Sequence, residues 1–276
     1  MLKFIASDMD GTLLDSNGRM NEEIYDIITE LKNMGIIFAA ASGRQLESLK
    51  KRFMPVDSDI IYLAENGNYV LYKGEELYSN VLEKETVDEV IEAIRGIDKS
   101  TAFLCGKKHA YAVDEELIKF MRQPIFGYDI VKVNDFSEVK DDILKVSLFD
   151  TVDPRERTLK ILAPKYENKL NMAVSGYNSL DIMNMGASKG TALKEIFTKF
   201  GINKSEAIAF GDNFNDIEML EEVGESYAMG NAEKYIKSKA SHVIGSNNEN
   251  AVIETLKRII EEIHLDEEGC KPRIGL

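Results

Sequence analysis

A pair of aspartates follows the first apolar segment of the chain. Residues 3–7 form a short apolar run that leads into the sequence DMDGT. A carboxylate at Asp8 could attack phosphorus as a nucleophile, and Asp10 could protonate the departing oxygen and then deprotonate a water molecule. Gly11 permits a tight turn, and Thr12 could tie that turn to the backbone. Taken alone, the cluster is also typical of an ordinary Asp-Gly turn.

Two smaller clusters could bind phosphate. Ser42 and Gly43 follow the apolar run 36–41, and a hydroxyl with backbone N–H groups at the start of a helix forms a phosphate cradle. Lys189 stands where another helix is expected to begin. By itself, a Ser-Gly pair is common in ordinary turns, and a lone lysine at such a position is typical of a solvated surface.

A fourth cluster has the composition of a metal site. The sequence GDNFND at 211–216 follows an apolar run that ends at Phe210. Its two carboxylates, Asp212 and Asp216, and its two amides, Asn213 and Asn215, suit a hard cation such as Mg²⁺. Turns that cap the next helix are the alternative interpretation of this cluster alone.

The four clusters supply complementary charges for one reaction. If Asp8 approaches a dianionic phosphate to roughly 4 Å, the repulsion is about 8 kcal/mol at an effective dielectric constant near 20. Lys189 and a Mg²⁺ ion held by Asp8, Asp212 and the backbone carbonyl of Asp10 would reverse that sign. We therefore expect an in-line phosphoryl transfer that is stabilised by position and charge.

Alternating strand and helix patterns carry these clusters. Asn21 is a candidate N-cap and Gly35 a candidate stop for the first helix. Strands are predicted near 3–7, 36–41, 60–64 and 207–210, and helices near 22–34, 46–53, 193–200, 217–223 and 248–264. The alternation predicts an α/β fold, a Rossmann-like doubly wound parallel sheet whose ligands bind beyond the carboxyl ends of the strands.

The middle of the chain has a different pattern. Short strand-like runs near 101–105, 111–113, 145–149, 171–174 and 180–183 alternate with helical stretches near 115–121 and 155–166. A capping box of Thr86 and Glu89 is expected to open the first helix of this part. We predict an α+β module at 83–186, inserted into a core made of 1–82 and 187–276, with a loose tail at 266–276.

The amino-acid composition limits the classes of partner that the protein is expected to bind. Lys and Arg total 34 against 48 for Asp and Glu, a formal charge of −14. This sign argues against nucleic acid or an anionic membrane as a partner, and no apolar run approaches the roughly 20 residues of a spanning helix. Asp8 comes too early for a signal peptide to precede it. Because Cys105 and Cys270 have no metal-site or disulfide spacing, we expect a cytoplasmic location.

The clusters, in this order, resemble the haloacid dehalogenase superfamily, most closely its Cof-type branch (subfamily IIB). The likeness extends along nearly the whole chain through DMDGTLL at 8–14, ASGR at 41–44, SKG at 188–190, GDNFND at 211–216 and AMGNA at 228–232. It implies a Mg²⁺-dependent phosphatase that hydrolyses a small phosphorylated metabolite, such as a sugar phosphate, through an aspartyl-phosphate intermediate on Asp8. It also implies that the module at 83–186 is a cap that selects the substrate.

The resemblance assigns roles to individual positions. Asp8 would be the nucleophile and Asp10 the acid and base, with Lys189 as a further catalytic group. The other implied roles are phosphate binding by Ser42, Gly43, Lys189 and Asn215, metal binding by Asp8, Asp10 and Asp212, and support by Thr12 and Asp216. Two departures from many relatives are Asn184 in place of proline and Ala251 in place of glycine.

Rival functions share parts of this pattern. A phosphosugar mutase uses the same nucleophile, and a non-enzymatic Mg²⁺-binding signalling domain has similar acidic residues. Such signalling domains are much shorter than 276 residues and lack an inserted cap. The substrate and the oligomeric state are not encoded in any motif. The loops at 107–109 and 175–178 are candidates for substrate contact, although a solvated loop is the commoner interpretation.

Overall fold

The computed structural model describes residues 1–123, 127–175 and 178–267. Within these ranges, the larger of two sheets has the strand order β14-β13-β12-β1-β2-β3-β4-β5. Six of its strands are parallel neighbours, and the hairpin of β4 and β5 extends the sheet with antiparallel pairs. The strands are β1 (Phe4–Asp8), β2 (Ile37–Ala41), β3 (Ile60–Ala64), β4 (Tyr69–Tyr72), β5 (Glu75–Ser79), β12 (Ala207–Gly211), β13 (Glu225–Ala228) and β14 (His242–Val243).

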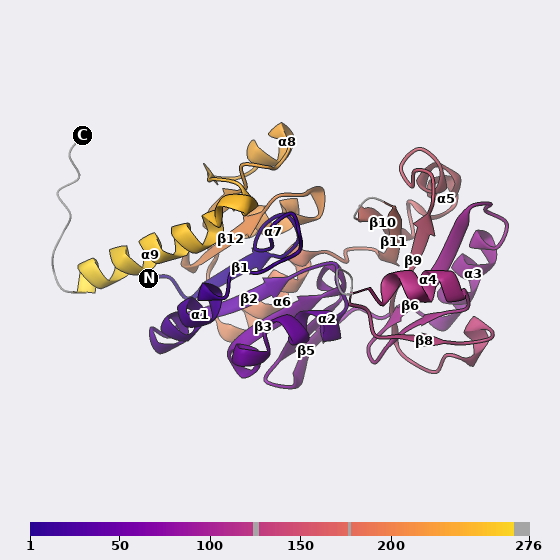
Figure 1. The fold of residues 1–276 in the computed structure, drawn as a ribbon, viewed down its shortest axis with the longest axis horizontal. Coiled ribbons are helices and arrows are strands. Elements are labelled where there is room, and N and C mark those ends of the chain that lie inside the picture. The colour runs from indigo at the N-terminus through magenta and orange to yellow at the C-terminus, as the bar shows by residue number, and fades with distance from the viewer. Residues whose placement is uncertain (124–126, 176–177, 268–276) are drawn as a thin grey trace.

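Helices cover both faces of the larger sheet, as Figure 1 shows. Successive residues of a strand point to opposite faces, so Ile5 packs with one group of helices while Phe4 and Ala6 pack with the other. The first group is α1 (Glu23–Asn33), α2 (Leu46–Arg52) and α9 (Ala251–Glu267), and the second is α6 (Lys189–Phe200), α7 (Ile217–Glu221) and α8 (Lys234–Lys237). The predicted doubly wound α/β fold is confirmed.

The inserted stretch forms a second sheet with the order β10-β11-β9-β6-β7-β8. Its pairs are antiparallel except β7 with β8. In Figure 1 this part, which we call the inserted module, lies to one side of the larger sheet. Its elements are α3 (Lys84–Ile94), β6 (Ser100–Gly106), β7 (Ala110–Ala112), α4 (Glu115–Met121), β8 (Ile130–Lys132), β9 (Ile143–Asp150), α5 (Thr158–Tyr166), β10 (Leu170–Ser175) and β11 (Ser179–Asn184).

The two chain segments that connect the inserted module to the larger sheet are tied together by one side chain. The amide of Asn184 donates hydrogen bonds to Asn80 Oδ1 at 2.9 Å and to the Val81 carbonyl at 2.7 Å. A proline, from which Asn184 was noted above as a departure, could donate neither bond. Asn184 therefore has a structural role, because its side chain links the segment that leaves the core to the segment that returns to it.

Several local predictions were wrong. The first module helix begins at Lys84 with no side-chain cap, so Thr86 and Glu89 do not form the predicted capping box at its start. The last helix begins at Ala251 and continues to Glu267, so the predicted tail includes helical residues, and 268–276 lie outside the described residues. A short 3-10 helix (Asn247–Glu249) precedes it. The predicted helix at 248–264 included residues of this separate element.

No helix among the described residues is long and apolar enough to cross a membrane. Cys105 is a buried free thiol, and Cys270 lies outside the described residues.

Candidate active site

Four adjacent strands end at one edge of the larger sheet. β12, β1, β2 and β3 are parallel neighbours in that order, so the residues at their carboxyl ends lie side by side. Asp212, Asp8, Ser42 and Glu65 occupy these four positions. The sequence analysis identified the first three as site residues and did not identify Glu65.

Lys189 connects two of the predicted carboxylates. It is the first residue of α6, whose N-cap Ser188 accepts a hydrogen bond from the Thr191 N–H. The Lys189 ammonium donates to Asp8 Oδ1 at 2.5 Å and to Asp216 Oδ1 at 2.6 Å. Its side chain is fully buried, so the interpretation of Lys189 as a solvated surface residue is wrong.

Asp216 holds the loop after β12 in place. Its Oδ2 accepts hydrogen bonds from the backbone N–H groups of Asp212 and Asn213, both at 3.0 Å. Thr12, in the loop after β1, donates its hydroxyl to Asp212 Oδ1 at 2.8 Å. The two loops are thereby fixed against each other, with Asp212 between them.

Gly11 allows these loops to approach closely. Its φ of +84° lies in the left-handed region, and a Cβ at this position would be only 2.4 Å from Asp212 Oδ2. Both the backbone conformation and the contact therefore require glycine.

The carboxylates are crowded, with Asp8 and Asp216 buried and Asp212 partly buried. Burial and the charge of Asp216 raise the pKa of Asp8 well above its usual value, against the opposing effect of Lys189. Burial and Asp216 also raise the pKa of Asp212 to about 6. One ammonium thus does not balance the negative charge of this cluster, which a further cation would relieve.

The donor set fits a hard divalent cation. Asp8, Asp212 and Asp216 each offer one carboxylate oxygen, and these atoms lie within 4.8 Å of one another. Oxygen donors of this kind suit Mg²⁺. Both oxygens of Asp216 already accept hydrogen bonds, from Lys189 and from two backbone N–H groups, whereas the bonds to Asp8 and Asp212 described above involve only Oδ1 of each. Asp8 and Asp212 are therefore the better placed ligands.

Asp10 lies at the exposed rim of the site. Its side chain is 51% exposed and forms a two-pronged ion pair with Arg44, at 2.6 Å to Nε and 2.5 Å to Nη2. Its carboxylate is not part of the three-carboxylate cluster, which leaves its backbone carbonyl as the group expected to contact a metal. Arg44 was present in the sequence motif at 41–44 but had been given no role.

The predicted phosphate ligands meet around Asn66. The Ser42 carbonyl accepts the Asn66 N–H at 2.9 Å, and the Ser42 hydroxyl accepts the Arg44 N–H at 3.1 Å. The Asn215 amide donates to Asn66 Oδ1 at 3.0 Å. A Cβ on Gly43 would be 2.9 Å from the same Asn66 oxygen. Asn66 therefore links the loops after β2 and β12, a role that the sequence could have suggested, since it closely follows β3.

The inserted module also contributes buried polar groups here. Lys145 of β9 donates to the Gly43 carbonyl at 2.9 Å and to Asp181 Oδ2 at 3.0 Å. Asp181 of β11 also accepts from the Asn66 amide at 3.0 Å and from the Ser147 hydroxyl at 2.6 Å. The sequence analysis identified none of these module residues, because each lies between two apolar residues of its strand.

The module loops that were predicted as candidates make other contacts. Lys107 forms an ion pair with Glu76 of β5 at 3.0 Å, and His109 Nδ1 lies 2.7 Å from Asp129 Oδ2. Of the second loop, 176–177 lie outside the described residues.

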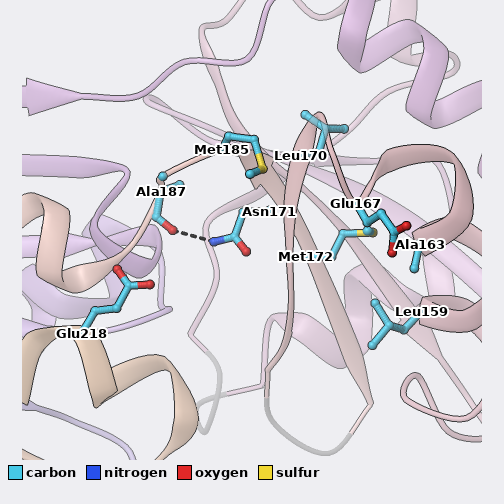
Figure 2. Close-up of a pocket in the computed structure, with 10 residues that line it drawn as sticks. Leu159, Ala163, Glu167, Leu170, Asn171, Met172, Met185, Ala187 and Glu218 are labelled. Atoms are coloured by element: carbon cyan, nitrogen blue, oxygen red, sulfur yellow. Dashed lines mark hydrogen bonds between the residues drawn. The ribbon is translucent and has the colours of Figure 1, made fainter.

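A cavity of about 410 Å³ lies at the returning connection rather than at Asp8. Figure 2 shows Met185 and Ala187 of this connection beside Asn171, whose amide donates to the Ala187 carbonyl at 2.7 Å. Glu218 of α7 lies below Ala187 in this view, and Leu159, Ala163 and Glu167 lie on the opposite side. None of the predicted site residues lines this cavity, so it carries none of the chemistry described above.

Comparisons with known proteins agree with the geometry. The haloacid dehalogenase-like hydrolase family matches residues 5–256. The 5-amino-6-(5-phospho-D-ribitylamino)uracil phosphatase YbjI of Escherichia coli is 29% identical, over 94% of this chain and 97% of its own length. The HMP-PP phosphatase of Serratia proteamaculans is 27% identical, over 96% and 98% respectively. The structure of SMU.1108c from Streptococcus mutans superposes with a TM-score of 0.86 at 29% identity, covering 95% of this chain and all of that one.

Proposed function

Since this chain belongs to the haloacid dehalogenase-like hydrolases, an enzyme family whose relatives here are named phosphatases, we propose that it hydrolyses a small phosphate monoester through an aspartyl-phosphate on Asp8. The observation that carries the proposal is the placement of the Lys189 ammonium between Asp8 and Asp216 at the carboxyl ends of β1 and β12.

Asp8 would attack phosphorus while Lys189 offsets negative charge. The ammonium is already in contact with the nucleophile, and both groups are buried, so the attraction between Lys189 and an incoming phosphate is weakly screened. Ser42, Gly43 and Asn215 would bind the phosphate oxygens. Asp216 would hold Lys189 and the loop after β12 in place, and Thr12 would hold Asp212.

Asp10 would transfer protons at the rim. In the first step it would donate a proton to the departing oxygen, and in the second it would remove one from the water that attacks the acyl phosphate. Its half-exposed carboxylate suits both tasks, because it must reach the leaving group and solvent. The pair of bonds from Arg44 fixes the direction in which Asp10 points.

Mg²⁺ is the proposed cofactor, with Asp8, Asp212 and the Asp10 carbonyl as its ligands. When bound, the ion would neutralise the crowded carboxylates and the charge of the transferring phosphoryl group. The support for this assignment is the three-carboxylate cluster and the raised pKa values of Asp8 and Asp212.

We further propose that the core consists of 1–82 and 187–276, and that 83–186 is a cap that selects the substrate. Every group given a chemical role above lies in the core. The names of the two relatives, which specify a phosphorylated ribitylamino compound and HMP-PP, support small soluble metabolites as the substrate class. A cytoplasmic location, without nucleic-acid or membrane partners, stays a prediction from charge and cysteine content.

The test is a phosphate-release screen of the purified protein with and without Mg²⁺. The panel would contain phosphorylated sugars and polyols, pyridoxal phosphate, nucleotides and flavin mononucleotide. We expect Mg²⁺-dependent release from a subset of monoesters. Return of phosphate to a sugar in the presence of a bisphosphorylated activator would instead identify a mutase, and no turnover of any ester would contradict the proposal.

A further inference from the structure

A buried polar cluster joins the inserted module to the core beside the predicted phosphate ligands. We call it the junction cluster. Lys145 and Asp181 are each 1% exposed, as is Glu65, so three ionisable groups are almost completely withdrawn from water. The cluster consists of Cys105, Lys145, Ser147 and Asp181 from the module and Glu65 and Asn66 from the core.

The module residues of the junction cluster share one face of the second sheet. Cys105 is paired with Lys145 across β6 and β9, and Asp181 is paired with Ser147 across β11 and β9. Alternate residues of β9, such as Val146 and Leu148, instead pack with α3 and α5 in the module core. Period-two alternation therefore places all four polar side chains on the face that meets the core.

This face is continuous with the phosphate-binding loops. Lys145 donates to the carbonyl of Gly43, and Asp181 accepts from the Asn66 amide. Asn66 in turn accepts from Asn215. A single residue thus separates the module carboxylate from a predicted phosphate ligand, so the organic part of a bound ester would fall on the junction cluster.

Glu65 has unused bonding capacity. Its Oε2 lies 2.9 Å from the Lys145 ammonium, and the weakly donating Cys105 thiol is also near. Neither carboxylate oxygen makes a hydrogen bond of good geometry among the described residues. Burial raises the pKa of Glu65, against the opposing effect of Lys145. Oε1 in particular, which has no ion-pair partner like that of Oε2, is a buried acceptor without a donor among the described residues. Such an acceptor is costly, and a ligand hydroxyl would supply the donor.

The backbone at Glu65 and Asn66 is strained in support of this arrangement. Their φ values are +52° and +59°, in the left-handed region that residues other than glycine rarely adopt. The segment is held there by bonds from the Glu65 N–H to the Arg44 carbonyl and from the Asn66 N–H to the Ser42 carbonyl. Strain of this kind persists where a site requires a fixed geometry.

A purely structural role explains the junction cluster poorly. Burying one ammonium with two carboxylates carries a desolvation penalty that often exceeds the attraction, and apolar residues of similar size are commonly as stable. The apolar face of the same sheet, packed with α3 and α5, already stabilises the module. The charges on the opposite face therefore call for a role in binding.

We propose that Glu65, Lys145 and Asp181 form the leaving-group subsite of the phosphatase, and that they select an uncharged leaving group rich in hydroxyls, such as a polyol or sugar. This proposal rests on the proposed function. A hydroxyl can donate to Glu65 or Asp181 and accept from Lys145, so it satisfies both kinds of group. When a ligand enters, the bond from Lys145 to the Gly43 carbonyl and the bond from Asn66 to Asp181 break. Bonds to the ligand replace them.

The same charges disfavour a second phosphate. A phosphate group offers acceptors, which only Lys145 among the three could satisfy, and it would face two carboxylates. The junction cluster therefore predicts a preference for polyol and sugar monophosphates over sugar bisphosphates.

The test measures kcat/KM for three esters: sorbitol 6-phosphate, fructose 1,6-bisphosphate and p-nitrophenyl phosphate. In Asp181→Asn we expect the sorbitol 6-phosphate value, divided by the p-nitrophenyl phosphate value, to fall by about 10- to 100-fold, the effect of losing a charged hydrogen-bond acceptor. The corresponding ratio for the bisphosphate should rise. Lys145→Met should lower the ratio for both sorbitol 6-phosphate and the bisphosphate.

Asp150→Asn is the matched control. Like Asp181, Asp150 is a buried carboxylate of the second sheet, but it lies at the end of β9 and pairs with Arg157 inside the module. Its substitution should therefore leave the ester ratios unchanged even if Tm falls. Parallel loss for all three esters in Asp181→Asn and Lys145→Met would overturn the subsite, as would unchanged ratios. If the wild-type protein hydrolyses p-nitrophenyl phosphate or another ester of the wider panel but not sorbitol 6-phosphate, the subsite fails while the proposed function stands; if it hydrolyses no ester of that panel, both fail.

Discussion

The ammonium of Lys189 lies 2.5 Å from the carboxylate of Asp8, although 181 residues separate them in the chain. Neither side chain is accessible to bulk solvent to any large extent. The contact brings the N-terminus of α6 to the carboxyl end of β1, and it joins the first and third of the clusters that the sequence placed far apart.

Lys189→Ala should lower kcat/KM for every phosphate ester together. The substitution removes a charge that all substrates share, and loss of one such group commonly costs on the order of 10² to 10³ in kcat. Lys194→Ala is the control, because Lys194 lies on the same helix with its side chain 61% exposed. Loss of activity towards some esters but not others would contradict a common role for Lys189, and circular dichroism would show whether the fold is retained.

Removal of the metal should abolish the phosphatase activity reversibly. We expect EDTA to abolish phosphate release, Mg²⁺ to restore it and Ca²⁺ to restore little, because Ca²⁺ takes more ligands at longer distances and would engage the attacking carboxylate. Mg²⁺ should also raise the Tm of the metal-free protein. Asp212→Asn should lose most of this rise in Tm. Full turnover in excess chelator would exclude a metal-dependent mechanism.

The space between the loops after β1 and β12 can be probed with glycine substitutions. Gly74→Ala introduces a side chain at a φ of +80° with no atom within 4 Å of the new Cβ, and should cost about 1 kcal/mol through backbone strain alone. Gly11→Ala has a similar φ but places its Cβ against Asp212. For Gly11→Ala we expect a larger loss in the free energy of unfolding in urea than for Gly74→Ala, and weaker Mg²⁺ binding. Equal effects of the two variants would show that the loops after β1 and β12 can separate freely.

Glu206 should stabilise the fold in a pH-dependent way. Its bonds with Lys3 and with the Asn203 N–H lower its pKa to about 2. A carboxyl whose folded pKa lies below its ordinary value of 4.5 contributes stability above that value, and the contribution is lost as the pH falls towards 2. Glu206→Gln should therefore lower Tm at pH 7, with a deficit that shrinks below pH 4.5.

The Lys3→Met background is the control for this effect. There, Glu206→Gln should cause a smaller loss of Tm, because the bond with Lys3 has already been removed. A deficit that stays constant from neutral to acidic pH would contradict the ionic origin of the effect.

The strand-end residues of the core could be predicted because parallel strands bring their carboxyl ends to one edge. This topology links Asp8, Ser42 and Asp212 whatever the details of packing. The same logic would have included Glu65 after β3, but a Glu-Asn-Gly sequence there is also typical of a turn. Only the structure shows that Asn66 bonds to Asn215 from that turn.

The contribution of the inserted module could not be predicted from sequence. Lys145 and Asp181 each lie between two apolar residues of their strands, and their bonds to Gly43 and Asn66 depend on how the two sheets meet. The predicted loop residue Lys107 instead forms an ion pair with Glu76 near the edge of the larger sheet. The alternation of Lys145 and Ser147 with Val146 and Leu148 distinguishes the two faces of β9, but it does not show which residues of the other sheet the polar face meets.

The central claim is that Asp8 carries the phosphoryl group, and trapping the acyl phosphate tests it most directly. Protein mixed with Mg²⁺ and a hydrolysed ester would be quenched in acid and reduced with borohydride, which converts an aspartyl phosphate to homoserine, and peptides would be identified by mass spectrometry. We predict homoserine at position 8 in the wild type, neither homoserine nor turnover in Asp8→Asn, and normal labelling in the control Asp26→Asn on the exposed face of α1. Homoserine at another carboxylate, or continued turnover by Asp8→Asn, would contradict the account.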